Sequence, residues 1–389
     1  MGSMDVPGPG ATVAGLRKEI GWGQARLASA AGLSTSYLGK IERGERALSQ
    51  GVAAALARAM GIPLGRVLGA AAPPPDSAGS LRKLHSAVRR FDIPGEGAAT
   101  EGDLRKRLAE MVRLRGDANL SDVLEKLPGL VSGVQDHAHA AGTPQAWSMV
   151  SQAYSAVYWL AARHRWMTLA DLAVTKQKIA ARAADPVTLA IAARDEAGVH
   201  LNHGEWGDGL AVVDRAIVRV EESTSGRERA YALGMLHLRG LTLAGRAKEK
   251  KAADSHIAKA LELAEDFSEE VNRFGIHFGP ENTMVHVIAT SGDLNRHRRA
   301  IEVMEQLTQG GMTLPATRIS PLHMNIARSN LAVGDREKAL DHLERAWALA
   351  PQLSSVHPTS REVLRVLAIR HKRSNPRLMR LARMAKMNV

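Results

Sequence analysis

Residues 16–49 read LRKEIGWGQARLASAAGLSTSYLGKIERGERALS, and the apolar spacing of this stretch decides the fold of the N-terminal part of the chain. The spacing indicates two helices, over residues 24–31 and 34–43. Gly32 lies between them, at a turn where the left-handed backbone conformation is cheapest for glycine. The two helices would cross closely through Leu27, Ala28, Leu33, Leu38 and Ile41. The pattern predicts a helix-turn-helix, with a generic helical hairpin as the alternative.

Further helices are expected on either side of this pair, at residues 13–19, 49–60 and 64–68. Residues 12–69 would then form a five-helix domain, preceded by a disordered segment at 1–11 that begins with a tag-like MGSM. Three consecutive prolines in GAAAPPPDSAGS, residues 69–80, forbid a continuing helix. We therefore expect a linker and connecting helix over 70–100 and a second unit over 101–389.

The composition favours helices throughout. Only 4% of the 389 residues are aromatic, and aromatic residues are typical of strands. The chain contains no cysteine, which excludes disulfides and thiolate chemistry. No apolar run approaches the roughly 20 residues that a bilayer requires, so we expect a cytoplasmic, nucleoid-associated protein with no membrane partner. The net charge of +12 is concentrated at the two ends, with excesses of four positive charges in residues 1–70 and eight in residues 361–389. Basic ends on a soluble chain favour a nucleic-acid partner.

The second unit reads as consecutive amphipathic helices without a strand. In GDREKALDHLERAWALAP, residues 334–351, a Gly-Asp turn precedes a helix with Ala339 and Ala346 on one face, and Pro351 closes it. These small residues resemble the close-packing positions of a tetratricopeptide (TPR) repeat. Similar turn markers occur at Gly204, Gly245 and Gly292, at irregular intervals. We expect an all-α protein in which five to seven TPR-like helical hairpins form a solenoid, an unrelated helical bundle being the alternative. Leu378, Leu381 and Met384 suggest a basic C-terminal capping helix, or else a basic tail that contacts DNA phosphates or an acidic partner.

Residues 12–69 resemble the XRE (Cro/C1-type, lambda-repressor-like) helix-turn-helix regulators. The resemblance implies that Arg17 and Glu42 form an ion pair bracing the domain. It also implies that Thr35, Ser36 and Lys40 contact base edges, and that the helix starting at the N-cap Ser34 lies in the major groove. By the same resemblance Gln24 meets a phosphate, and Arg43 and Arg46 more naturally hold phosphates than bases. The full set of predicted DNA-binding residues is Gln24, Ser34, Thr35, Ser36, Lys40, Arg43 and Arg46.

The whole chain resembles the TPR-bearing regulators of high-GC Gram-positive bacteria, including RRNPP-type pheromone receptors that serve quorum sensing. Residues 278–293, FGPENTMVHVIATSGD, resemble a segment that recurs in these regulators. The resemblance implies a homodimer that binds an inverted-repeat operator and a signalling peptide or small molecule in its solenoid. One carboxamide matches both the N–H and C=O of an extended peptide. The predicted ligand residues are Asn202, Asn282, His286 and Asn325, which could instead be helix caps or ties between repeats.

Other chemistry is poorly supported. Asp136, His137 and His139 lack metal-ligand spacing, since residues two apart on a helix face different ways. Phosphate-loop, HExxH and GxSxG motifs are missing, so we expect no enzyme, no metal and no cofactor. Two rival functions stay open: a TPR docking scaffold for a partner protein, and a maintenance repressor of a mobile element that needs no small ligand.

Overall fold

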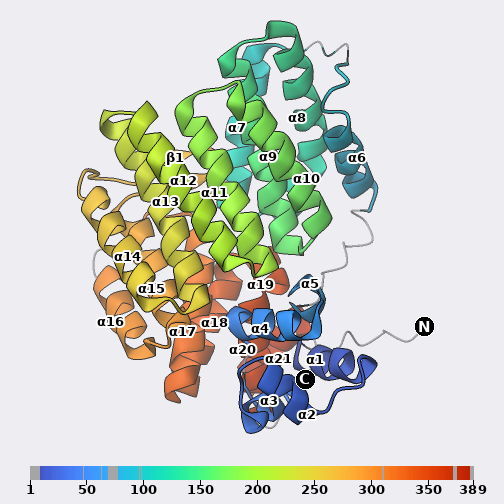
Figure 1. Cartoon of the computed structure of the whole chain (residues 1–389), viewed down its shortest axis with the longest axis vertical. Coiled ribbons are helices and arrows are strands. Elements are labelled where there is room, and N and C mark those ends of the chain that lie inside the picture. Colours follow the sequence, from blue (N-terminus) through green and yellow to red (C-terminus); the bar gives the residue numbers. More distant parts are fainter. Residues whose placement is uncertain are drawn as a thin grey trace.

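Among the described residues, five helices form the N-terminal end of the molecule, which we call the head (Figure 1). The computed structural model describes residues 9–46, 48–62, 64–68, 78–95, 97, 99–308, 311–370 and 375–385. The head helices are α1 (Pro9–Glu19), α2 (Gln24–Ala30), α3 (Thr35–Glu42), α4 (Gln50–Met60) and α5 (Leu64–Leu68). These bounds agree with the five predicted helices, except that α1 begins at Pro9. Residues 9–11 are therefore helical rather than disordered, and residues 1–8 of the expected tag lie outside the described residues.

The turn between α2 and α3 has the predicted construction. Gly32 adopts a φ of +66°, the left-handed conformation that costs glycine least. Leu27, Ala28, Leu38 and Ile41 are buried. The two helices therefore cross on the small and apolar side chains that the sequence indicated.

Six helix pairs follow and form most of the remaining molecule, which we call the body. They are α7 (Glu101–Gly116) with α8 (Leu120–Ala141), α9 (Pro144–His164) with α10 (Met167–Arg182), α11 (Pro186–His203) with α12 (Trp206–Ser223), α13 (Gly226–Ala247) with α14 (Lys250–Ala264), α15 (Pro280–Asp293) with α16 (His297–Thr308), and α17 (Ala316–Val333) with α18 (Arg336–Leu349). The last helices are α19 (Pro351–Val356), α20 (Pro358–Arg370) and α21 (Pro376–Met384). The fold is all-α with a helical repeat-like body, and its assignment to the TPR class stays a prediction.

Two of the four predicted turn glycines lie inside helices. Gly204 and Gly334 end α11 and α17 in the left-handed conformation, as expected. Gly245 and Gly292 instead belong to α13 and α15, where a Cβ would come within 2.8 Å of Thr290 and 3.0 Å of Arg328 respectively. At Gly245 the lack of a side chain permits close packing against α15, and at Gly292 it leaves room for the Arg328 guanidinium. Neither glycine forms a turn.

A short antiparallel hairpin interrupts the helices, contrary to the expectation of no strand. β1 (Val271–Arg273) pairs with β2 (Ile276–Phe278). Phe278 is fully buried, and a Cβ on Gly234 of α13 would lie 2.1 Å from its ring. The hairpin is held because a glycine on the neighbouring helix leaves room for an aromatic ring. Six residues of strand are too few to give a readable alternation.

The body closes on itself. Besides the contacts between consecutive pairs, α7 contacts α17 and α9 contacts α19. The first helices of the pairs therefore surround a common centre. The connecting helix α6 (Ala78–Arg89) packs on α8, and its Leu84 and Val88 belong to the apolar core that α7–α10 form. Residues 78–80 are therefore helical and do not belong to the linker. Residues 69–77 of the expected linker lie outside the described residues.

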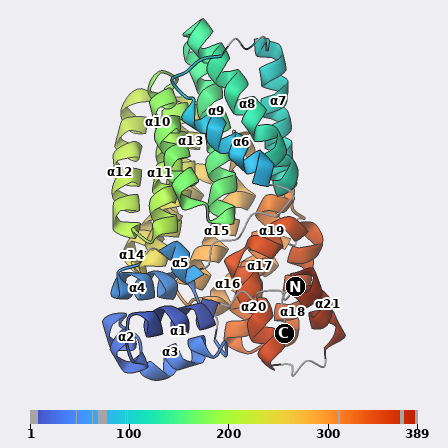
Figure 2. The same ribbon diagram turned by 90° about the vertical axis from the view of Figure 1, so that its right-hand side faces the viewer.

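The head is docked on the body (Figure 2). Its core residues form one continuous apolar cluster with those of α11–α13. Arg58 of α4 donates to the Gly204 carbonyl at 3.2 Å and lies 5.1 Å from the Trp206 ring.

The C-terminal helix α21 packs on α18. Arg377 of α21 donates to Glu344 of α18 at 2.6 Å, and Leu378 and Leu381 are buried. These contacts agree with a C-terminal capping helix, although Met384 is 47% exposed.

Candidate DNA-binding surface and central cavity

The outer face of α3 is open to solvent. Ser34 caps the helix, its Oγ accepting from the backbone N–H of Tyr37 at 3.1 Å. Ser34, Thr35, Ser36 and Lys40 are all exposed. Both views place α3 at the end of the molecule that the head occupies, far from α7 and α8 (Figures 1 and 2). The predicted base-reading side chains thus share a surface that another large molecule can approach.

Arg17 and Glu42 brace this surface from behind. The Arg17 guanidinium donates from Nε and Nη2 to the two Glu42 oxygens at 2.7 and 2.8 Å, and from Nη1 to the Trp22 carbonyl at 2.8 Å. Burial works to raise the pKa of Glu42, but hydrogen bonds from Arg17 and Gln24 hold it below its ordinary value. A two-pronged, nearly buried pair of this kind fixes α1 against the end of α3.

The side chains predicted to contact phosphate already have partners within the head. The Gln24 amide donates to Glu42 at 2.8 Å. Arg43 is exposed and donates to Glu45 at 2.6 Å, while the exposed Arg46 guanidinium lies 5.1 Å from the Tyr37 ring centre. An exposed ion pair contributes little, so exchanging Glu45 for a phosphate would cost Arg43 little. The phosphate roles of these residues stay predictions.

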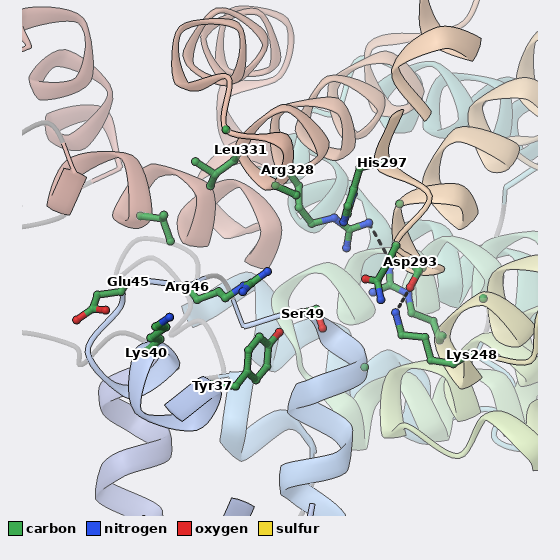
Figure 3. Close-up of a pocket in the computed structure, with 18 of the residues that line it drawn as sticks. Tyr37, Lys40, Glu45, Arg46, Ser49, Lys248, Asp293, His297, Arg328 and Leu331 are labelled. Carbon is green, nitrogen blue, oxygen red and sulfur yellow. Dashed lines mark hydrogen bonds and ion pairs between the residues drawn. The ribbon is translucent and has the colours of Figure 1, made fainter. Parts of the chain in front are cut away.

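A cleft of about 530 Å³ separates α3 from the body (Figure 3). Tyr37, Lys40 and Arg46 line it from the head, and the helix ends around Asp293 line it from the body. Asp293 accepts from Arg328 at 2.9 Å, and the neighbouring Lys248 donates to its backbone carbonyl. Lys40 therefore stands at the border between the exposed face of α3 and the cleft.

A second cavity, of about 280 Å³, lies at the centre of the body. Side chains from all six first helices line it, together with the hairpin turn at Gly275 and the α19–α20 junction at His357. Gln50, the first residue of α4, also lines it, and Arg246 borders both this cavity and the cleft. The central cavity thus touches the head directly.

The structure brings together three of the four predicted ligand residues. Asn202 and His286 line the central cavity, and Asn282 lines a small adjoining pocket that shares His286 with it. Asn325 of α17 is half-buried and lines none of the described cavities.

Both cavity asparagines are engaged within the body. The Asn202 amide donates to the Gly198 carbonyl at 2.8 Å and accepts from Arg165 at 3.0 Å. The Asn282 amide donates to the His277 carbonyl at 2.6 Å and accepts from Arg318 at 2.8 Å. These bonds favour the alternative in which the two asparagines connect segments of the body. They do not favour amides that are free to bind a peptide backbone.

Sequence reasoning missed the arginines of the central cavity. Seven line it: Arg115, Arg163, Arg165, Arg194, Arg239, Arg246 and Arg318. They are spread over more than 200 residues, in segments whose overall charge is balanced, so no local run of basic residues signals them. The available signal was arginine on the first helix of several successive pairs.

The residues considered for a metal have other contacts. Asp136 accepts from the Gly95 N–H at 2.6 Å, and His139 bonds to the Phe91 carbonyl at 2.8 Å. Within the described residues, only the turn group His200, Glu205 and Asp208 has three potential ligand atoms within 4.8 Å of one another. Two of the three are exposed, and His200 is already bonded to Glu205 at 2.8 Å.

Comparison with known proteins decides what the head is. The sequence model of the helix-turn-helix family matches residues 14–67. Residues 14–67 are a helix-turn-helix domain. The XRE-type head predicted from the sequence is therefore confirmed. No curated protein matches the sequence. Among the helices that the structure describes, none is long and apolar enough to cross a membrane.

Solved structures with distant similarity span most of the chain. PrgX in its complex with iCF10 is 10% identical, with 98% of each chain covered and a TM-score of 0.27. PrgX in its complex with cCF10 is 11% identical, with 88% of this chain and 93% of PrgX covered and a TM-score of 0.25. BtubC (BKLC) from P. vanneervenii is 14% identical over 64% of this chain and 91% of its own, with a TM-score of 0.37.

Proposed function

We propose that the protein is a sequence-specific DNA-binding transcriptional regulator that reads its operator with α3. The observation that carries the proposal is the exposure of Ser34, Thr35, Ser36 and Lys40 on one end of a helix-turn-helix domain. Lysine donates to guanine O6 and N7, and hydroxyls donate or accept at base edges. Arg43 and Arg46 lie next to this face and supply charge for phosphates.

We further propose that the regulator acts as a homodimer on an inverted repeat. Helix-turn-helix dimers place two recognition helices about 34 Å apart on one face of the duplex, which one head alone cannot do. The docked head supports this arrangement, because a head fixed to its body holds a defined position in a dimer. We place the protein in the cytoplasm, associated with the nucleoid, in a regulatory rather than a catalytic role.

An effector in the central cavity would control the head. Gln50 lines that cavity and begins α4, which packs on α2. A ligand in the cavity would therefore touch the head at α4, one helix away from the helix-turn-helix. The effector can shift DNA affinity only by its different affinity for two head–body arrangements. We propose a signalling peptide or small molecule for this role, as in quorum sensing.

The proposal is tested by selecting duplexes from a random library with the full-length protein, followed by a footprint upstream of its own gene with and without culture extract. We expect the selected duplexes to contain an inverted repeat. We also expect culture extract to change how strongly the protein protects that repeat in the footprint. Ser36→Asp on α3 should abolish selection, whereas Ser29→Asp, at another exposed serine on α2, should weaken it mildly. Failure to select any sequence at moderate salt would refute the proposal.

The two rival functions give different results. A docking scaffold would recover a stoichiometric partner protein, with no ligand effect on DNA affinity. A maintenance repressor without a small ligand would bind its own promoter with or without extract.

A further inference from the structure

The central cavity holds far more positive than negative charge. Of the residues that line it, seven are arginines and only Asp195 is a carboxylate. Asp195 is already engaged, since it accepts from Arg194 at 2.9 Å, Ser155 at 2.7 Å and Gln177 at 3.1 Å. Arg246 has its own partner outside the cavity, Asp293, at 2.9 Å. Within the described part of the chain, none of the remaining arginines forms an ion pair with a carboxylate, although Asp195 attracts Arg115 and Arg239 and Glu270 attracts Arg318 from a longer distance.

Three of these arginines bond only to neutral acceptors among the described residues. Arg115 donates to the Phe274 carbonyl at 2.6 Å, Arg163 to the Trp159 carbonyl at 3.0 Å and Arg165 to Asn202 at 3.0 Å. Their Nε atoms, and that of Arg239, are buried and find no hydrogen-bond partner in the described ranges. Arg115 is 4% exposed and Arg165 is 9% exposed.

Such a cluster is costly without a counter-charge. Burial lowers the pKa of Arg115, Arg165, Arg239 and Arg318 to about 10 each. Since these values stay well above 7, the four side chains keep their charge at neutral pH. Buried cations without carboxylates destabilise a protein, because solvation is lost and no ion pair replaces it.

We propose that the central cavity binds a small polyanion that carries two or more phosphate or carboxylate groups. The arginines come from α7, α9 and the residue that follows it, α11, α13 and α17, and line the same space, so several anionic groups can be held at once. Guanidinium forks suit phosphate and carboxylate oxygens equally. The volume of about 280 Å³ lies near the lower end of the range for small-molecule sites, and suits a compact anion better than an extended peptide. Its regulatory meaning rests on the proposed function, but its binding does not.

The test measures binding of tripolyphosphate and of citrate to the full-length protein by calorimetry and thermal unfolding. Ionic strength is held constant with sodium chloride. We expect saturable binding of one anion per chain and a melting temperature that rises with anion concentration. Binding of tripolyphosphate alone would indicate a phosphate ligand, and binding of citrate alone a carboxylate ligand.

A matched pair of variants on α7 locates the site. Arg115→Gln should weaken binding by about tenfold or more, because a charged partner of the buried anion is lost. Arg113→Gln, two residues away, removes an arginine that is 63% exposed and paired with Asp117, and should leave binding unchanged. Circular dichroism checks that each variant is folded. Arg163→Lys provides a second, charge-conserving variant and should weaken binding less than Arg163→Gln.

The proposal is overturned if neither anion binds above the chloride control, or if Arg113→Gln and Arg115→Gln lose affinity equally. Binding of an acidic peptide when neither small anion binds would also overturn it. DNA affinity is measured separately, with and without the anion. A protein that binds the anion but no duplex would keep this site and lose the proposed function.

Discussion

Glu362 of α20 accepts a hydrogen bond from the backbone N–H of Leu48, at 3.2 Å across 314 residues of sequence. Leu48 lies between α3 and α4, so this bond joins the connection that follows α3 to the C-terminal part of the body. Glu362 is 3% exposed, and its other oxygen accepts from Arg365 at 2.9 Å. Burial raises the pKa of this carboxyl. The position of α3 is therefore tied to the last helices of the chain.

Replacing Glu362 with alanine should loosen the head. The change leaves the Leu48 N–H and the Arg365 guanidinium without their acceptor, which we expect to lower the free energy of unfolding by about 1–3 kcal/mol. Hydrogen exchange at the Leu48 amide should accelerate, as measured by mass spectrometry or NMR. Glu337→Ala removes a carboxylate on α18 that is 66% exposed and should change neither quantity. Equal effects of the two variants would contradict the assigned link.

Removing one partner of the Arg17–Glu42 pair should leave the other as an unpaired charge, so the losses of the two single variants should not add. Arg17→Met leaves a nearly buried carboxylate, and Glu42→Leu leaves a guanidinium, so each single change should lower the free energy of unfolding by about 3–5 kcal/mol. The double variant should lose less than the sum, because no unpaired charge is left. Denaturant unfolding of the four proteins completes the cycle, and additive losses would show that the pair is not coupled.

Lys40 and Arg46 should affect DNA binding in different ways. If Lys40 reads a base, Lys40→Ala costs about 1–3 kcal/mol on the selected operator and little on random DNA. Arg46→Ala should weaken binding to both duplexes alike. It should also lower the slope of log affinity against log salt concentration by about one, because one phosphate contact is lost. Fluorescence anisotropy over a salt series measures both effects. Equal losses on the two duplexes for Lys40→Ala would refute its role in base reading.

The head was predictable because its signals are local. Gly32, the Ser34 cap and the apolar spacing of α2 and α3 each act over a few residues, so the helices and the turn can be read from one stretch. The Arg17–Glu42 contact, by contrast, was expected from the family resemblance. The family model confirms the domain. The body was predictable as five to seven helical hairpins, and the described residues form six helix pairs. Two of its turns were misplaced, because Gly245 and Gly292 look like turn markers until their neighbours Thr290 and Arg328 are known.

The central cavity was not predictable from local patterns. Its charge depends on ring closure, which brings Arg115 of α7 and Arg318 of α17 to one space from positions about 200 residues apart. The hydrogen bond between Leu48 and Glu362 likewise joins residues that are far apart in the sequence, so no local pattern predicts it. The candidate asparagines were found by family resemblance, yet their bonds to Gly198 and His277 depend on packing that no spacing shows.

Acidification should destabilise the body through its paired histidines. His237 bonds to His256, and His323 bonds to His342, each through Nδ1 atoms 2.9 Å apart and with the same 19-residue spacing. A bond between two imidazole nitrogens requires one of them to be unprotonated. Burial, aided by the partner histidine, lowers the pKa of His237 and of His323 to about 4.

Because histidine in the unfolded chain titrates near 6.5, the unfolded state binds more protons than the folded state between about pH 6.5 and 4. Stability is therefore full above about pH 6.5 and is lost as the pH falls toward 4, by about 1–3 kcal/mol per histidine. Urea unfolding at pH 7, 6 and 5 should show this slope, and His323→Gln should reduce it. Asn325→Gln, a non-titrating change on the same helix, should shift stability equally at every pH. A His323→Gln protein with the full wild-type slope would exclude this histidine as a source of the acid sensitivity.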